Sequence, residues 1–288
     1  MTKELVGFVG TGHMGGPMTL RLLAAGYDVC IYDRDQKAVQ ALVKKGAVAA
    51  KSAADVANRA ETIFLSLPNP EIVNAVALGK DGLIEGKKVK RVIDFSTVGP
   101  KTAVVVFKGL SAKKVSYVDA PVSGGVKAAT EGTLVMMMGG SDQDVAKVKE
   151  IVKSYAKTIT HIGGVGHGQV AKLCNQIAQV INIQGVAESL RFAQANGADL
   201  QKVFEAISGG MAGSRMLDLM GPKMVSRDFK AGIEARLHAK DFFLVKDAAT
   251  KSHLDMPALQ TVAVQLEKLM ESGWGYDDTS SLLKVLEA

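Results

Sequence analysis

The chain has 288 residues, of which 47% are hydrophobic and 22% charged, a composition typical of a globular protein. Its 35 basic and 29 acidic residues give a net charge of +6. The lysines are scattered and only 5% of residues are aromatic, so we expect no nucleic-acid partner. No apolar run reaches the ~18 residues of a membrane helix, and we expect neither a signal peptide nor a membrane partner. Two cysteines, Cys30 and Cys174, exclude a disulfide scaffold and favour a reducing, cytoplasmic location.

Short apolar runs alternate with stretches of helical spacing in the first half of the chain. Strands are expected at residues 5–9, 28–32, 62–67, 91–95, 115–118 and 134–139, and helices at residues 14–25 and 37–45. Strands separated by helices of this length form parallel sheets with helices on both faces. The first half therefore predicts an α/β domain with a doubly wound parallel sheet.

The second half shows helical spacing only. A long helix is expected at residues 170–195, followed by helices near residues 199–207, 214–226, 237–251 and 256–272. We therefore expect an α/β domain over residues 1–162 and an all-α domain over residues 163–288, joined by the long helix.

The first predicted strand runs into a turn that fits the pattern G-x-G-x-x-G. The turn consists of Gly10, Thr11, Gly12, His13, Met14 and Gly15. Gly10 permits the tight turn, Gly12 lets a pyrophosphate approach the backbone, and Gly15 lets the next helix pack against the sheet. The alternative is a glycine-rich turn without a ligand. A strand before the turn, a helix after it and an acid beyond the second strand favour a dinucleotide site.

The choice between the two nicotinamide cofactors depends on the end of the second strand. Asp33 stands where a carboxylate accepts hydrogen bonds from the adenosine ribose and repels a 2′-phosphate. Arg34 could instead bind that phosphate, and Asp35 partly cancels its charge. We expect NAD, with NADP as the open alternative, although Asp33 could also simply begin the next turn.

Two further strand ends are predicted beside the first. Leu67 and Pro68 close the third strand, and Ser96 and Thr97 close the fourth. Ligands of open α/β sheets lie beyond the carboxyl ends of the strands, so main-chain groups at Leu67-Pro68 and the hydroxyl of Thr97 are candidate cofactor contacts. Ordinary turn chemistry explains both pairs equally well.

A second set of residues is richer in polar groups than packing requires. Ser123, Gly124 and Gly125 form a turn whose hydroxyl and amides can hold a carboxylate, or which is only a turn. Lys172 and Asn175 share one face at the start of the long helix. A lysine there either reaches solvent or donates a proton to a carbonyl oxygen during hydride transfer.

Lys240 and Asp241 lie in a later helix and read either as a solvated charged pair or as part of a site. The five histidines show none of the spacings of a zinc site, so we expect no metal.

Four motifs together resemble the β-hydroxyacid dehydrogenase family, the group that includes 3-hydroxyisobutyrate dehydrogenases. They are FVGTGHMGGPM, DAPVSGG, GHGQVAKLCNQ and HAKDF, and the resemblance covers nearly the whole chain. It implies a Rossmann-like domain joined by a long helix to an all-α domain, an NAD(P)-dependent oxidoreductase, and a homodimer or homotetramer. The stretch ISGGMAGSRMLDLMGPKM is similar to tartronate semialdehyde reductases within the family.

The resemblance also implies individual roles. It makes Lys172 the general acid/base, and it makes Ser123, Gly124, Gly125 and Asn175 contacts of the substrate. It makes Leu67, Pro68 and Thr97 contacts of the cofactor, with Lys240 near the nicotinamide. Thr11 stands where the family usually has leucine, and Gln176 where many members have asparagine. Neither departure affects the expected chemistry.

Alternatives remain for the substrate and, more distantly, for the activity. A 3-hydroxyisobutyrate, 4-hydroxybutyrate or threonate-type dehydrogenase differs from a tartronate semialdehyde reductase by a hydroxyl or a methylene on the substrate, worth about 1–3 kcal/mol in an apolar pocket. An imine reductase shares this architecture but usually has aspartate or tyrosine in place of the lysine. A cofactor-binding module without turnover would have lost the lysine.

Overall fold

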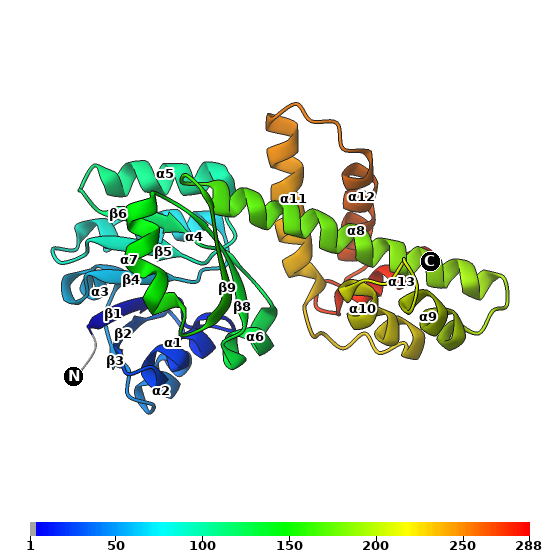
Figure 1. The fold of residues 1–288 in the computed structure, drawn as a ribbon, viewed down its shortest axis with the longest axis horizontal. Coiled ribbons are helices and arrows are strands. Elements are labelled where there is room, and N and C mark those ends of the chain that lie inside the picture. Colours follow the sequence, from blue (N-terminus) through cyan, green and yellow to red (C-terminus); the bar gives the residue numbers. More distant parts are fainter. Residues whose placement is uncertain (1–3) are drawn as a thin grey trace. The chain divides into compact units, whose positions relative to one another are not determined.

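The computed structural model describes residues 4–288. They divide into two compact units, the first ending at Lys172 and the second spanning Leu173–Ala288. The first unit is a sheet flanked by helices and the second is helical (Figure 1). The Rossmann-like domain followed by an all-α domain is therefore confirmed. The division falls inside the long helix, after Lys172.

The sheet of the first unit has the strand order β3-β2-β1-β4-β5-β6-β8-β7, with β9 paired to β8. Neighbouring strands from β3 to β6 are parallel. Their carboxyl ends therefore meet at one edge of the sheet, where the order reverses beside β1. The strands are β1 (Leu5–Val9), β2 (Asp28–Tyr32), β3 (Val48–Ala49), β4 (Thr62–Leu65), β5 (Arg91–Asp94), β6 (Ser116–Asp119), β7 (Val122–Ser123), β8 (Leu134–Gly139) and β9 (Ala156–Gly163).

Parallel pairs dominate the sheet, as expected, and β8 is the exception. β8 pairs antiparallel with β6 and with β7, and β9 then pairs parallel with β8. Ala120 and Pro121 interrupt the line of β6 and β7, and after a short helix the chain turns at Gly132, which has a positive φ of 75°. A chain that returns directly beside the strand it has just left must run antiparallel, because a parallel return needs a crossover.

Helices cover both faces of this sheet because its buried strands are apolar on both sides. Phe8 and Phe64 belong to a core on one face, and Ile63 and Leu65 to a core on the other. The first core includes side chains of α1, α2 and α7, and the second those of α3, α4 and α5. The helices are α1 (Gly15–Ala24), α2 (Gln36–Val43), α3 (Ala53–Arg59), α4 (Pro70–Leu78), α5 (Gly99–Ser111), α6 (Gly125–Glu131) and α7 (Asp142–Val152).

The long helix α8 (His167–Ala195) starts in the first unit and continues through the second. The second unit buries one apolar core, to which α8, α10, α11, α12 and α13 contribute. Its other helices are α9 (Leu200–Ser208), α10 (Arg215–Ser226), α11 (Ala235–Lys251), α12 (Pro257–Glu271) and α13 (Leu282–Glu287).

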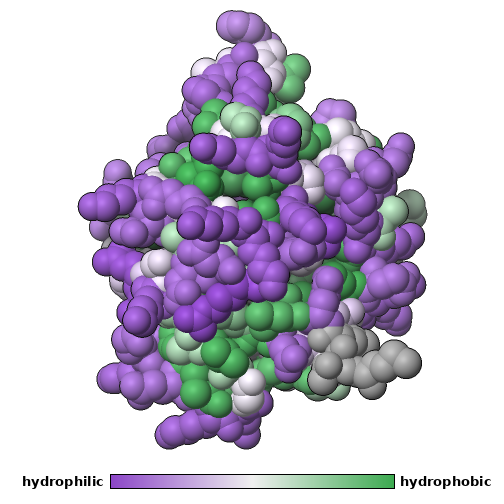
Figure 2. All heavy atoms as spheres, turned by 90° about the vertical axis from the view of Figure 1, so that its left-hand side faces the viewer, coloured by the Kyte–Doolittle hydropathy of each residue, from purple (hydrophilic) through white to green (hydrophobic). Residues whose placement is uncertain are grey.

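Polar side chains dominate the face of the molecule in Figure 2, with apolar side chains scattered between them. Within residues 4–288, every helix is too short or too polar to cross a membrane.

Candidate active site

The glycine-rich turn between β1 and α1 depends on two of its glycines for its shape. Gly10 has a φ of +89°, and a Cβ there would lie 2.3 Å from the carbonyl oxygen of Ser66. A Cβ on Gly15 would lie 1.8 Å from the carbonyl oxygen of Gly10. By contrast, no described atom lies within 4 Å of a Cβ built on Gly12. The fold requires Gly10 and Gly15, whereas Gly12 leaves open space above its backbone, as a pyrophosphate would need.

The first turn of α1 suits an anion. Its N-cap residue, Met14, makes no capping hydrogen bond through its side chain, and the turn contains no acidic residue. His13 is exposed beside it and Met14 is half-buried. The amide groups and positive dipole end of this helix therefore fit a phosphate-bearing cofactor.

The structure brings Asp33 directly to this turn. Oδ2 of Asp33 accepts a hydrogen bond from the Thr11 amide at 2.5 Å and another from the Thr11 hydroxyl at 3.3 Å. Oδ1 accepts from the amide of Asp35 at 2.8 Å. Arg34 is exposed, and Asp35 uses its side chain to cap α2 through the amide of Lys37. The carboxylate of Asp33 is thus fixed beside the turn, where it suits a ribose and opposes a 2′-phosphate.

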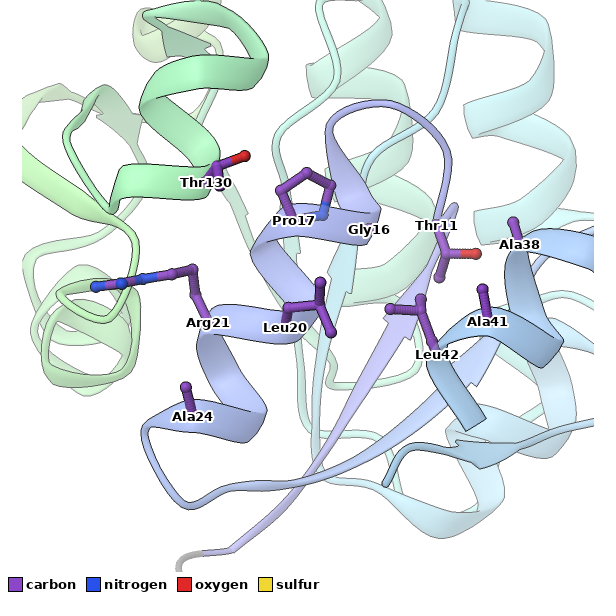
Figure 3. A pocket seen from close by; sticks show the side chains of 10 residues that line it. All are labelled: Thr11, Gly16, Pro17, Leu20, Arg21, Ala24, Ala38, Ala41, Leu42 and Thr130. Atoms are coloured by element: carbon purple, nitrogen blue, oxygen red, sulfur yellow. The ribbon is translucent and has the colours of Figure 1, made fainter. Parts of the chain in front are cut away.

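A groove of about 420 Å³ lies beside the same turn, between α1, α2 and α6 (Figure 3). It is lined by Thr11, Gly16, Pro17, Leu20, Arg21, Ala24, Ala38, Ala41, Leu42 and Thr130. Thr11 is the only predicted site residue in this lining, and most of the other side chains are apolar. The groove therefore does not define the predicted site.

Hydrogen bonds connect the segments that follow β4 and β5, as expected for two strand ends at one edge of the sheet. The amide of Leu67 donates to Oγ of Ser96 at 2.8 Å, and the amide of Ser96 donates to Oδ1 of Asp94 at 2.9 Å. Thr97 follows and is half-buried, while Pro68 is exposed. Leu67-Pro68 and Thr97 thus lie at neighbouring strand ends.

The turn predicted to hold a carboxylate lies between β7 and α6. Ser123 is half-buried and pairs in register with Val135 of β8. Gly124 and Gly125 have φ values of +128° and +67°, which side-chain-bearing residues rarely adopt. Glycine is therefore needed here for backbone geometry.

Lys172 lies in α8 and is 8% exposed, so it is not a solvated surface lysine. Asn175 follows three residues later on the same helix.

A line of polar contacts connects Asn175 to α11. Nδ2 of Asn175 donates to Oε1 of Gln176 at 2.9 Å, and Nε2 of Gln176 donates to Oδ2 of Asp241 at 2.9 Å. Oδ1 of Asp241 pairs with Nζ of Lys240 at 2.8 Å. Asp241 is 9% exposed and the Lys240 side chain 32%, so the pair is partly buried. The glutamine that replaces the usual family asparagine is the link in this line.

Sequence reasoning gave no role to four buried polar residues at the ends of β5 and β6 and the start of α8. These are Asp94, Tyr117, Asp119 and Gln169. Burial raises the pKa of Asp94 to about 6, although hydrogen bonds from Ser96 and Tyr117 favour its charged form. Burial likewise raises the pKa of Asp119 to about 6, against the lowering effect of hydrogen bonds from the amides of Gly166 and Gln169. An aspartate at the end of an apolar strand was the only available signal.

Among residues 4–288, no cluster of three or more histidine, cysteine or acidic side chains could hold a metal ion. The residues that suit a cofactor are those of the glycine-rich turn and Asp33, and they suit a dinucleotide.

Comparison with known proteins agrees with this geometry. Residues 5–163 match the NAD binding domain of 6-phosphogluconate dehydrogenase, and residues 166–286 match the NAD-binding domain of NADP-dependent 3-hydroxyisobutyrate dehydrogenase. The chain is 35% identical to the 2-hydroxy-3-oxopropionate reductase of Escherichia coli (strain K12), over 98% of this chain and 97% of the relative. The chain belongs to the β-hydroxyacid dehydrogenase family. Being a member, it is an NAD(P)-dependent oxidoreductase that acts on hydroxy acids.

Two further relatives of this dehydrogenase are named for, or solved with, other substrates. It is 33% identical to the NAD-dependent L-serine dehydrogenase of Pseudomonas aeruginosa, over 98% of this chain and 97% of the relative. A solved 3-hydroxyisobutyrate dehydrogenase of Mycobacterium tuberculosis with L-serine superposes with a TM-score of 0.92 and 28% identity, over the whole of both chains. Family membership therefore establishes the reaction class, whereas the substrate differs between relatives.

Proposed function

We propose that this dehydrogenase interconverts tartronate semialdehyde (2-hydroxy-3-oxopropionate) and glycerate, with NAD as the preferred cofactor. The choice of substrate is supported by the 35% identity, over nearly the full length of both chains, to a 2-hydroxy-3-oxopropionate reductase. The preference for NAD rests on Asp33, whose carboxylate is fixed beside the glycine-rich turn and opposes a 2′-phosphate.

In this proposal the cofactor is bound by residues 1–162 together with Lys240. The turn residues Gly10, Thr11, Gly12, His13, Met14 and Gly15 hold the pyrophosphate at the start of α1. Asp33 and Arg34 border the adenosine ribose, while Leu67, Pro68, Thr97 and Lys240 hold the nicotinamide half. A bound nicotinamide would supply or accept the hydride at the carbon that bears the oxygen.

Lys172 is the general acid/base in this mechanism. In the reductive direction its ammonium donates a proton from Nζ to the carbonyl oxygen, which becomes the hydroxyl of glycerate. Solvent then returns a proton to the amine. In oxidation the neutral amine takes the hydroxyl proton. The positive charge of Lys172 also stabilises the oxygen as it gains negative charge.

The substrate is held by its other polar groups. Ser123 and the amides of Gly124 and Gly125 bind the carboxylate, with the hydroxyl of Ser123 as a donor. Asn175 donates its Nδ2 to Gln176, which leaves its Oδ1 to accept from the substrate hydroxyl.

Residues 163–288 contribute the substrate side and the subunit interface, so we expect a homodimer or homotetramer in solution. Light scattering of the purified protein measures this state directly. A monomer at assay concentrations would contradict it.

The substrate proposal is tested by initial rates of NADH and NADPH oxidation with tartronate, methylmalonate and succinate semialdehydes. NAD reduction with L-serine, 3-hydroxyisobutyrate and threonate is measured beside them. We expect the highest kcat/KM for tartronate semialdehyde with NADH. Faster turnover of another acid would reject the substrate, and a preference for NADPH would reject the role of Asp33.

A further inference from the structure

The first turn of α8 is capped by a side chain from a distant strand. Gly166 precedes the helix and has no side chain with which to cap it. Asp119, at the end of β6, takes its place: Oδ2 accepts from the amide of Gln169 at 2.8 Å, and Oδ1 accepts from the amide of Gly166 at 2.7 Å. These are the two bonds of a capping box, supplied here by one carboxylate. The start of α8 is therefore fixed to the carboxyl end of β6.

Gln169 fixes the same turn to the end of β5. Its side chain is fully buried, and its Oε1 accepts from the amides of Val98 at 3.0 Å and Gly99 at 3.1 Å. Its Nε2 donates to the carbonyl oxygen of Ser96 at 2.8 Å. One side chain thus holds the main chain on both sides of Thr97.

The connections continue into the sheet. Ser96 accepts from the amide of Leu67 and donates its own amide to Asp94, whose other oxygen accepts from the hydroxyl of Tyr117 at 3.1 Å. The start of α8, the segment around Thr97 and the segment at Leu67 are therefore joined in one buried hydrogen-bond network.

Two glycines let the helix approach the strands closely enough for these bonds. A Cβ on Gly168 would lie 2.5 Å from the carbonyl oxygen of Met137 and 2.7 Å from that of Asp119. A Cβ on Gly139 would lie 2.5 Å from Oδ1 of Asp119. Side chains at these positions would displace the helix from the carboxylate.

We propose that Asp119 and Gln169 are positioning residues for Lys172. Lys172 lies three residues beyond Gln169, about 4.5 Å along the helix axis. A network that fixes Gln169 therefore fixes Lys172 relative to the segments that carry Leu67 and Thr97. Misplacing a reacting group by about 1 Å lowers a rate by up to about 100-fold. The proposal rests on the proposed function, in which Lys172 is the general acid/base.

The experiment removes the bonds of Gln169 and keeps its length, with Gln169→Met. Gln184→Met is the matched control, since Gln184 is also buried in α8 but donates to Glu188 of the same helix. Single-turnover rates with NADH and tartronate semialdehyde, Kd for NADH and Tm are measured for both variants. Gln169→Met is also combined with Lys172→Ala.

We expect Gln169→Met to lower the single-turnover rate about 10- to 100-fold while Kd for NADH changes less than about threefold. Gln184→Met keeps the wild-type rate. In the Lys172→Ala background, Gln169→Met should change the rate less than about twofold, because the residue through which it acts is gone. Asp119→Asn, which keeps one acceptor, should show the same pattern with a smaller loss. It replaces Gln169→Met in the test if Gln169→Met does not fold.

Equal losses in the presence and absence of Lys172 would overturn the proposal and leave the network a structural role only. An unchanged rate in both Gln169→Met and Asp119→Asn would overturn it as well. A wild-type rate in Lys172→Ala alone would instead reject the proposed function, so the two failures are distinguishable.

Discussion

Replacing Asp94 with asparagine should make the protein more stable near neutral pH and should lose that advantage in acid. Asp94 is fully buried at the end of β5, and its carboxylate accepts from the Ser96 amide and the Tyr117 hydroxyl. Asparagine keeps both partners, because its oxygen accepts from Ser96 and its amide nitrogen can donate to the oxygen of Tyr117. The substitution therefore removes a buried charge and keeps the hydrogen bonds.

The magnitude follows from the pKa of Asp94, which burial raises from 3.8 to about 6. Between these pH values the folded protein retains a proton that the unfolded chain has released, so stability falls as pH rises through this window. Above it, two pKa units at about 1.4 kcal/mol each give a penalty of about 3 kcal/mol for the charged form. The free energy of unfolding of Asp94→Asn should thus gain about 3 kcal/mol on the wild type between about pH 4 and about pH 7.

Urea denaturation followed by circular dichroism measures this difference across the pH range, with m-values compared to confirm similar unfolding transitions. Asp28→Asn is the control, because Asp28 is exposed at the start of β2 and loses the same charge. A stability difference between Asp94→Asn and wild type that stays constant with pH would refute the reasoning. So would an equal pH-dependent gain in the control.

Three other predictions test separate parts of the structure. Asp33→Ser should raise the ratio of kcat/KM for NADPH over NADH by at least about tenfold, and an unchanged ratio would contradict the assigned role. Gly168→Ala should destabilise by about 1–3 kcal/mol. On the same helix Gly185→Ala, with open space around its Cβ, should stabilise by about 0.5–1 kcal/mol, so equal Tm shifts would argue against close packing at Gly168. Asp241→Asn removes the ion pair of Lys240 and should raise KM for NADH about 3- to 10-fold. An unchanged KM would contradict the role of Lys240 in cofactor binding.

The parallel part of the fold could be predicted because its signals are local. β1, β2, β4 and β5 are each a short apolar run, whereas β3 was missed because it has only two residues and both are exposed. β9 was missed because most of its residues are exposed and it lacks an apolar run. β7 was missed because it has two residues and follows Pro121, and its pairing depends on β8.

Some residues of the candidate site could also be predicted from local signals, and others could not. The glycine-rich turn and Asp33 follow from spacing along the chain, and the structure brings them together. The start of α8 at His167 was placed three residues late, since Gly166 and Gly168 suggest a loop and the cap comes from Asp119, 47 residues before Gly166. Gln169 was missed because its side chain bonds main-chain atoms about 70 residues away, which no local pattern shows.

The proton-transfer role of Lys172 is tested most directly by single-turnover reduction of tartronate semialdehyde by NADH with Lys172→Ala. General acid–base catalysis contributes about 10²- to 10⁴-fold, so we predict a loss of that size with an unchanged Kd for NADH. A rate within about threefold of the wild type would contradict the account, because hydride transfer would then proceed without the lysine.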